Sequence, residues 1–188
     1  MKAIPTVAID FRWFDHMAGG GQYRYGVDLV RGIAEIAPEM KFVVLGTREQ
    51  PVEEMRTVFD GERWRYVQVP RIEGRGKLYR EMARYRGLLR EWKADVLHSL
   101  HSFVPVAPGV PVVETVHDMM LEIFPEYAGV VRSREYRVHR WAFRKWVTRA
   151  IAISEATATD LERLWDWHRE KTEVVYHGQK FGAVPDFG

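Results

Sequence analysis

The chain contains no cysteine, and this absence removes three classes of chemistry. A disulfide scaffold, a thiolate-bound zinc ion and a catalytic thiol all require cysteine side chains. The sequence also lacks an apolar run of about 20 residues and an opening basic segment followed by an apolar one. We therefore expect neither a transmembrane helix nor a secretion signal, and the default expectation is a soluble intracellular protein.

The length of 188 residues predicts one domain, at roughly 100–200 residues per domain. Hydrophobic residues make up 46% of the chain and charged residues 29%, which is ordinary globular usage and excludes a disordered or collagen-like chain.

The net charge of +2 conceals an uneven distribution. Segments 71–93 and 132–149 carry eight and seven basic residues against three and one acidic ones, so together they hold +11 and the rest of the chain −9. Exposed helix faces are usually charged, which explains the presence of charge but not its single sign. Anionic lipid, an acidic or lipid-phosphate acceptor, or nucleic acid could each bind such a surface. The expected basic surface comprises Arg80, Arg84, Arg137, Arg140 and Arg144.

Short apolar or alternating runs alternate with segments of helical periodicity along the chain. Strands are expected at residues 3–9, 41–46, 64–69, 95–98, 110–116, 150–153 and 172–176, and helices at 22–37, 51–59, 77–92, 132–148 and 154–165. Helical crossovers imply parallel strands covered on both faces. The expected fold is α/β: a Rossmann-like, doubly wound, mainly parallel sheet of about seven strands with helices on both faces.

Ligands of such sheets bind outside the carboxyl ends of the strands. Five of the seven histidines lie at the predicted strand ends: His16, His98, His101, His117 and His177. This clustering indicates a functional edge, although polar residues also collect in loops for no functional reason.

Three glycines, Gly19, Gly20 and Gly21, precede Gln22 and the first predicted helix. Backbone amides of such a loop can approach an anion, which the helix dipole favours. A plain flexible turn is the alternative, because the spacing matches neither the dinucleotide fingerprint nor the P-loop.

The remaining strand-end residues leave several roles open. His98 and His101 could suggest a metal pair, but a third ligand is lacking, so we expect substrate hydrogen bonding or loop polarity and no metal cofactor. His117 can hydrogen-bond a hydroxyl or act as a base, and Asp118 can orient it or cap the turn. Ser154 is expected to cap a helix.

Four stretches in this order resemble the N-terminal domain of family 4 glycosyltransferases, which are retaining enzymes of the GT-B fold. They are the loop and helix at 19–31, the strand at 95–98, the strand end and loop at 113–127, and the segments 151–161 and 174–178. Two details depart from the family pattern: His177-Gly178 stands where Asn-Gly is usual, and the glycines run together before Gln22.

The resemblance implies that residues 1–188 form one acceptor-side domain that closes over a nucleotide sugar. Gly19, Gly20, Gly21 and Gln22 would approach the donor diphosphate. His117 would hydrogen-bond the transferred sugar, with Asp118 beside it as the second candidate catalytic residue. His16, His98, His101 and Ser154 are the candidate contacts to the acceptor or the sugar.

The resemblance also implies a second, nucleotide-sugar domain that this chain does not contain. That domain brings the basic residues that neutralise the leaving diphosphate, so we expect these 188 residues alone to be inactive. The expected partners are the second domain, a nucleotide sugar and a glycan or lipid-linked acceptor.

Family 4 enzymes often act at the cytoplasmic membrane face, so a cytoplasmic protein with peripheral contact to anionic lipid is expected. Leu78, Trp92, Trp141 and Trp146 are nevertheless expected to face the core. The alternative is a non-catalytic Rossmann-like module whose basic face binds nucleic acid or a membrane; nucleic acid is disfavoured, because no nucleic-acid-binding motif is present.

Overall fold

The computed structural model describes residues 4–14, 20–37, 39–72, 74, 76–101, 103–127 and 129–178. Within them, seven strands form one sheet in the order β3-β2-β1-β4-β5-β6-β7, and every neighbouring pair is parallel. The strands are β1 (Thr6–Asp10), β2 (Lys41–Gly46), β3 (Trp64–Gln68), β4 (Val96–Ser99), β5 (Val112–Val116), β6 (Val147–Ala152) and β7 (Thr172–Val174).

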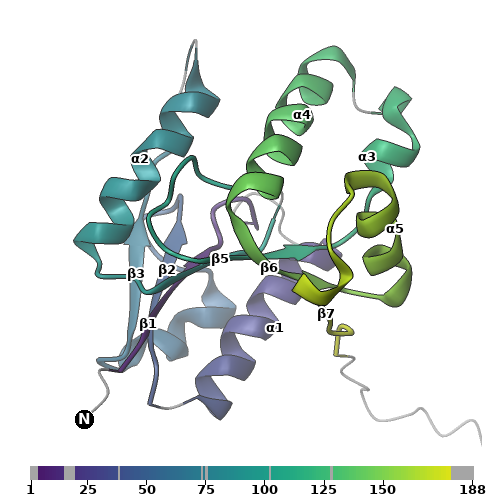
Figure 1. Ribbon diagram of the computed structural model, residues 1–188. Helices are drawn as coiled ribbons and strands as arrows, with labels where there is room; N and C mark the ends of the chain where they lie inside the picture. Colours follow the sequence, from purple (N-terminus) through teal and green to yellow (C-terminus); the bar gives the residue numbers. More distant parts are fainter. Residues whose placement is uncertain are drawn as a thin grey trace, which may run out of the picture.

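Helices cover both faces of this sheet, as Figure 1 shows. The α-helices are α1 (Gly21–Ile36), α2 (Lys77–Glu91), α3 (Met120–Ile123), α4 (Gly129–Trp146) and α5 (Glu155–Trp165), and the 3₁₀ helices are η2 (Glu53–Asp60), η3 (Pro125–Tyr127) and η4 (Arg169–Lys171). α1 lies below the sheet in this view, and α2 and α4 lie above it. The predicted doubly wound α/β fold is confirmed.

Alternation along the strands builds a separate core on each face. In β1, Ala8 packs with the cluster that α2, α4 and α5 cover, whereas Ile9 packs with the cluster under α1 and η2. Neighbouring residues of a strand point to opposite faces, so a strand buried on both faces is apolar throughout. This explains the continuous apolar run of β1.

The chain reverses its direction of winding between β1 and β4, which neighbour each other at the centre of the sheet. The segments that follow β1 and β4 therefore diverge and leave a crevice at the carboxyl edge. At the opposite edge the exposed turn Gly61–Arg63 leads into β3, where the Trp64 amide donates to Gly61.

Several element bounds differ from expectation, and two of the differences have a structural interest. The helix predicted to run to residue 148 ends at Trp146, and Val147 already opens β6 beside Val112 of β5. β-Branched side chains at Val147 and Thr148 favour the strand. The short helix expected at residues 51–59 is the 3₁₀ helix η2, over Glu53–Asp60.

The exposure of one tryptophan also corrects an expectation. Trp92 and Trp146 pack against the core as expected, but the side chain of Trp141 is 51% exposed. Leu78 belongs to α2, but its side chain lies outside the described residues. None of the helices formed by the described residues is long and apolar enough to cross a bilayer.

Candidate active site

A cleft of about 440 Å³ lies at the carboxyl edge of the sheet, and we call it the main cleft. Residues following three strands line it: Trp13 after β1, His101 and Phe103 after β4, and His117 and Asp118 after β5. Gln22 from α1 and residues of α2, α3 and α4 complete the lining. The sheet topology thus brings together three of the predicted site residues outside the first loop: His101, His117 and Asp118.

His117 is held in one orientation by its backbone partner. Its Nε2 lies 3.0 Å from the carbonyl oxygen of Leu100, which can only accept, so Nε2 carries the proton. Nδ1 is buried and has no hydrogen-bond partner among the described residues. Burial lowers the pKa of His117 below its usual value, so the ring is neutral at pH 7.

A group of aromatic rings surrounds His117. Tyr25 meets the imidazole edge-on at 5.1 Å between ring centroids and stacks on His177 at 4.5 Å. Phe14 also meets His117 edge-on, at 6.3 Å between ring centroids. His177 thereby joins the edge predicted from the histidine pattern.

His98 lies beneath this group and not at the surface. It belongs to β4, is 8% exposed, and its Nε2 lies 3.0 Å from the hydroxyl oxygen of Thr115, which is also 3.1 Å from the Tyr25 hydroxyl. Burial lowers the pKa of His98 to about 4. In this position His98 supports Thr115 and Tyr25 from below.

His101 forms the shared wall between the main cleft and a second hollow. Its ring stacks on Trp13 at 4.2 Å between centroids with 15° between the planes. Burial lowers the pKa of His101 to about 3, with a smaller repulsive contribution from His139, so this imidazole is also neutral. The second hollow, of about 200 Å³, is called the side pocket; Arg71 and Lys77 are among its lining residues.

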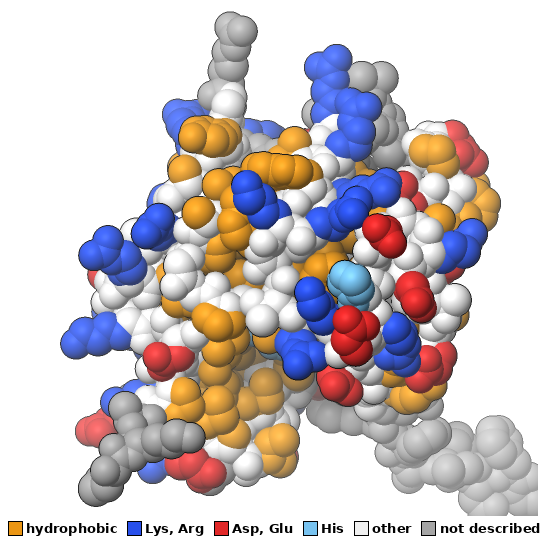
Figure 2. Space-filling view, in the orientation of Figure 1, with side chains coloured by type: hydrophobic (Ala, Val, Ile, Leu, Met, Phe, Trp, Pro, Cys, Tyr) orange, Lys and Arg blue, Asp and Glu red, His pale blue; other side chains and the backbone are white. Residues whose placement is uncertain are grey.

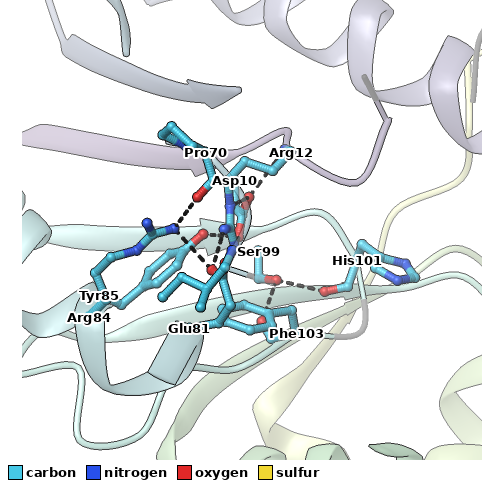
Figure 3. A network of polar contacts seen from close by, with 10 residues as sticks. Asp10, Arg12, Pro70, Glu81, Arg84, Tyr85, Ser99, His101 and Phe103 are labelled. Atoms are coloured by element: carbon cyan, nitrogen blue, oxygen red, sulfur yellow. Dashed lines mark hydrogen bonds and ion pairs between the residues drawn. The ribbon is translucent and has the colours of Figure 1, made fainter. Parts of the chain in front are cut away.

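A buried ionic network forms the floor of the side pocket (Figure 3). Arg12 pairs with Asp10 through Nε at 3.1 Å and with Glu81 of α2 through NH1 at 2.7 Å. Tyr85 donates its hydroxyl to Asp10 at 2.5 Å, and Arg84 contacts Glu81 at 3.1 Å. Burial acts to lower the pKa of Arg12, but the Asp10 carboxylate and its other partners raise it by more, so Arg12 stays charged.

The sequence interpretation missed this network because Arg12 and Glu81 are 69 residues apart in the chain. The available signal was Arg12 itself, a charged residue two positions beyond a buried strand.

The sequence interpretation also missed a second buried pair, whose members are likewise distant in the chain. Glu114 of β5 lies 2.8 Å from Nε2 of His139 on α4, and His139 lines the main cleft. Burial raises the pKa of Glu114.

The first turn of α1 faces this edge without a side-chain cap. Gly20 takes an extended conformation before the helix, no acidic residue lies in the first turn, and the first backbone bond runs from Arg24 to Gly20. The preceding amides of Gly21 and Gln22 consequently have no partner within the helix. His16 and Gly19, also predicted as site residues, lie outside the described residues.

The sequence of the chain matches the profile of Glycosyltransferase Family 4 over residues 19–179. The chain belongs to this family. No curated protein sequence matches the chain significantly.

Solved structures agree with the fold of this family 4 domain. It is similar to the lipopolysaccharide outer core galactosyltransferase WaaB, with a TM-score of 0.61 and 10% identity over 96% of this chain and 48% of WaaB. A glycosyltransferase from Rickettsia africae ESF-5 gives a TM-score of 0.55 and 10% identity over 92% of this chain and 43% of that protein.

A UDP-N-acetylglucosamine 2-epimerase from Rickettsia bellii is similar too, with a TM-score of 0.55 and 12% identity over 93% of this chain and 45% of the epimerase. At such identities the likeness shows the fold alone. The chain spans less than half the length of these three proteins.

Two predicted residues of the family 4 domain make local hydrogen bonds where helices start. Asp118 accepts from the Met120 amide at 2.9 Å and so caps the turn into α3. Ser154 accepts from the Thr157 amide at 3.1 Å, which confirms it as the N-cap of α5. Any contact of either residue with a substrate stays a prediction.

Metal-ligating residues do not gather within the described part of the family 4 domain. No group of three or more His, Asp or Glu side chains there has the arrangement needed to hold an ion. His98 and His101 do not form a metal-binding pair here, because His98 hydrogen-bonds with Thr115 and His101 stacks on Trp13.

Proposed function

We propose that this domain is the acceptor-side half of a retaining glycosyltransferase that moves a hexosyl group from a nucleotide sugar to a glycan or lipid-linked acceptor. The observation that carries the proposal is the main cleft of a family 4 domain, where α1 begins beside His117 at the carboxyl edge of the sheet. Family membership supports glycosyl transfer; retention and the hexosyl group belong to the proposal.

The start of α1 supports a role in binding the donor diphosphate. The amides of Gly21 and Gln22 have no partner within the helix, and no acidic side chain of the first turn offsets the positive end of the helix dipole. An anionic diphosphate is the kind of group that such a helix start accepts. Gly20 keeps the approach free of a side chain.

His117 supports a role in holding the transferred sugar. A neutral imidazole with Nε2 committed to Leu100 has one remaining acceptor, Nδ1, and Nδ1 has no partner among the described residues. A sugar hydroxyl that donates to Nδ1 would satisfy it after a small shift of the neighbouring rings. Asp118 also lines the main cleft, which supports a contact of its second carboxylate oxygen with the same sugar.

We further propose that charge neutralisation of the leaving diphosphate comes from a second domain, without a metal ion. No lysine or arginine is among the described residues that line the main cleft, and His101 and His117 there are neutral. Departure of a diphosphate needs preorganised positive charge. The 188-residue chain alone is therefore expected to transfer no sugar.

The test is a transfer assay with the two-domain enzyme, using a panel of nucleotide sugars and glycan acceptors. His117→Ala should lower kcat/KM by about tenfold, the effect of losing one hydrogen bond of about 1 kcal/mol to the sugar. His168→Ala is the matched control, because His168 is exposed and away from the cleft lining. NMR of the product tests retention, and equal activity of the two variants would contradict the role of His117.

A second surface supports peripheral contact with an anionic membrane at the cytoplasmic face. One face of α4 presents Arg137, Arg140, Trp141, Arg144 and Lys145 around a depression. Trp141 is half exposed and Lys145 lies 5.5 Å above its ring. In Figure 2, Lys and Arg side chains spread over the part of the molecule formed by α2 and α4.

Tryptophan at the centre of a basic face is suited to the lipid headgroup region, where each basic residue contributes about 1 kcal/mol. Co-sedimentation with vesicles of phosphatidylglycerol and phosphatidylcholine tests this surface at low and high salt. Trp141→Ala with Arg137→Gln should weaken sedimentation, whereas Arg65→Gln on β3 should not. Binding that ignores both salt and the α4 variant would contradict membrane contact.

A further inference from the structure

The side pocket opens directly beside the main cleft. The two share four lining residues: Trp13, His101, Phe103 and Glu135. A single molecule can therefore place one group next to His117 and another in the side pocket. The remaining question is which chemical group the side pocket is built to hold.

The charges of the floor cancel among themselves. Arg12 is fully engaged with Asp10 and Glu81, and Arg84 adds a second positive charge on Glu81, so two cations face two carboxylates. His101 contributes no charge, because burial lowers its pKa to about 3. The net charge of the pocket is set by the residues around its mouth.

Two cations and one carboxylate remain at the mouth: Arg71, Lys77 and Glu135. Neither Arg71 nor Lys77 forms an ion pair with any residue that the structure describes. The guanidinium of Arg71 lies 5.6 Å from the ring centre of Trp13, which holds it toward the wall shared with the main cleft. The pocket therefore has an excess of positive charge close to the proposed reaction centre.

Apolar surface lines the rest of the side pocket. Ile72 and Phe103 contribute to its wall, and Trp13 is 40% exposed there. Aromatic and aliphatic walls suit the carbon faces of a sugar ring, and forked guanidinium donors suit phosphate or carboxylate. The combination is that of a site for a saccharide bearing an acidic group.

We propose that the side pocket binds an acidic group on the acceptor, so that the acceptor is an anionic saccharide or a saccharide linked to phosphate, held by Arg71 and Lys77. The proposal rests on the proposed glycosyl transfer and deepens it by naming the class of acceptor. Phosphate and carboxylate share the recognition chemistry, and the probes below separate them.

Binding to the 188-residue chain is the direct test, read by backbone amide NMR shifts at Trp13, His101 and Phe103. The probes are glucose 6-phosphate, galacturonate, uncharged methyl glucoside, inorganic phosphate and UDP. Glucose 6-phosphate or galacturonate should bind at least tenfold more tightly than methyl glucoside, and the tighter of the two identifies the acidic group. Inorganic phosphate should bind more weakly than the better acidic sugar, because it leaves the apolar wall uncovered.

The variant Arg71→Gln with Lys77→Gln should weaken binding of the acidic sugars at least tenfold. Arg65→Gln, an exposed arginine on β3, is the control for loss of a positive charge and should leave binding unchanged. Both mutated residues are exposed, so the urea midpoint should stay that of the wild type, which confirms that the variant folds.

Four outcomes would overturn the proposal. The first three are no binding of any acidic sugar, binding of methyl glucoside as tight as that of the acidic sugars, and binding of inorganic phosphate as tight as that of the acidic sugars. The fourth is displacement of the acidic sugars by UDP, read at the same amides, which would mean that the side pocket binds the donor. A transfer assay with the two-domain enzyme separates this failure from failure of the proposed function. Transfer to neutral acceptors with an inactive anionic panel would reject only the acceptor class, whereas no transfer to any acceptor would reject the function.

Discussion

At Gly26, α1 packs tightly against the segment that follows β1. A Cβ there would lie 2.7 Å from Cε2 of Phe11 and 2.8 Å from Cδ2 of Phe14, and both rings are fully buried. We expect Gly26→Ala to lower the free energy of unfolding by about 1–3 kcal/mol, because the rings have no room to move. Urea denaturation measures this change.

Gly32 provides the matched control in the same helix, because a Cβ added there would meet no atom within 4 Å. Gly32→Ala should leave stability unchanged or raise it by up to about 1 kcal/mol, since alanine has the higher helix propensity. Equal losses for both substitutions would show that the contact with the two phenylalanines is not the cause.

His98 predicts a pH dependence of stability. Burial lowers its pKa from 6.5 to about 4, so the unfolded chain takes up the proton first as the pH falls. Stability contributed by the neutral ring is complete above pH 6.5 and is lost between pH 6.5 and 4, with a slope of about 1.4 kcal/mol per pH unit. Urea midpoints across this range measure the slope.

Protonation of His101 also lowers the free energy of unfolding over this pH range, because its pKa is lowered to about 3. A variant of His98 separates the two contributions. His98→Gln keeps a hydrogen-bonding amide beside Thr115 and removes the titration, so its slope should be shallower than that of the wild type. An unchanged slope would mean that His98 does not take part.

The N-terminus of α5 depends on one side chain. Ser154 accepts from the Thr157 amide, so Ser154→Ala should cost about 1 kcal/mol and Ser154→Asp almost nothing. Thermal melts of the three proteins measure this. If the alanine variant is as stable as the wild type while sugar binding by the two-domain enzyme is lost, Ser154 acts on substrate instead.

The elements could be predicted where local pattern and tertiary packing agree. α5 appears at its expected bounds because a serine cap is a local signal, and β1 appears as a strand that begins three residues later than expected. The end of α4 was placed two residues late because pairing of Val147 with β5 is a tertiary effect. Trp141 was assigned to the core because helical periodicity does not show which side of α4 the sheet occupies.

The site could be predicted only as an edge of the sheet. Strand ends identified His101 and His117, because parallel strands bring their carboxyl ends to one side. The partners of Arg12 could not be found, since Glu81 approaches it only through the packing of α2 on the sheet. Such contacts depend on how α2 packs on the sheet, which no local pattern reveals.

At the scale of the whole molecule, the proposal that transfer needs no metal has its own test. The described residues hold no metal-ligand cluster, and we propose that positive charge for the diphosphate comes from side chains of a second domain. Transfer by the two-domain enzyme should therefore keep its rate in EDTA. A loss of activity that Mn²⁺ or Mg²⁺ restores would contradict this.

The turn Gly61–Arg63 has a practical value for anyone who wishes to observe this domain. It lies at the edge of the sheet opposite the cleft, and Glu62 within it is exposed. Because the chain has no native cysteine, Glu62→Cys would give a thiol that reacts at one position only. A fluorophore attached there would report the binding of substrates or lipid vesicles without blocking the main cleft.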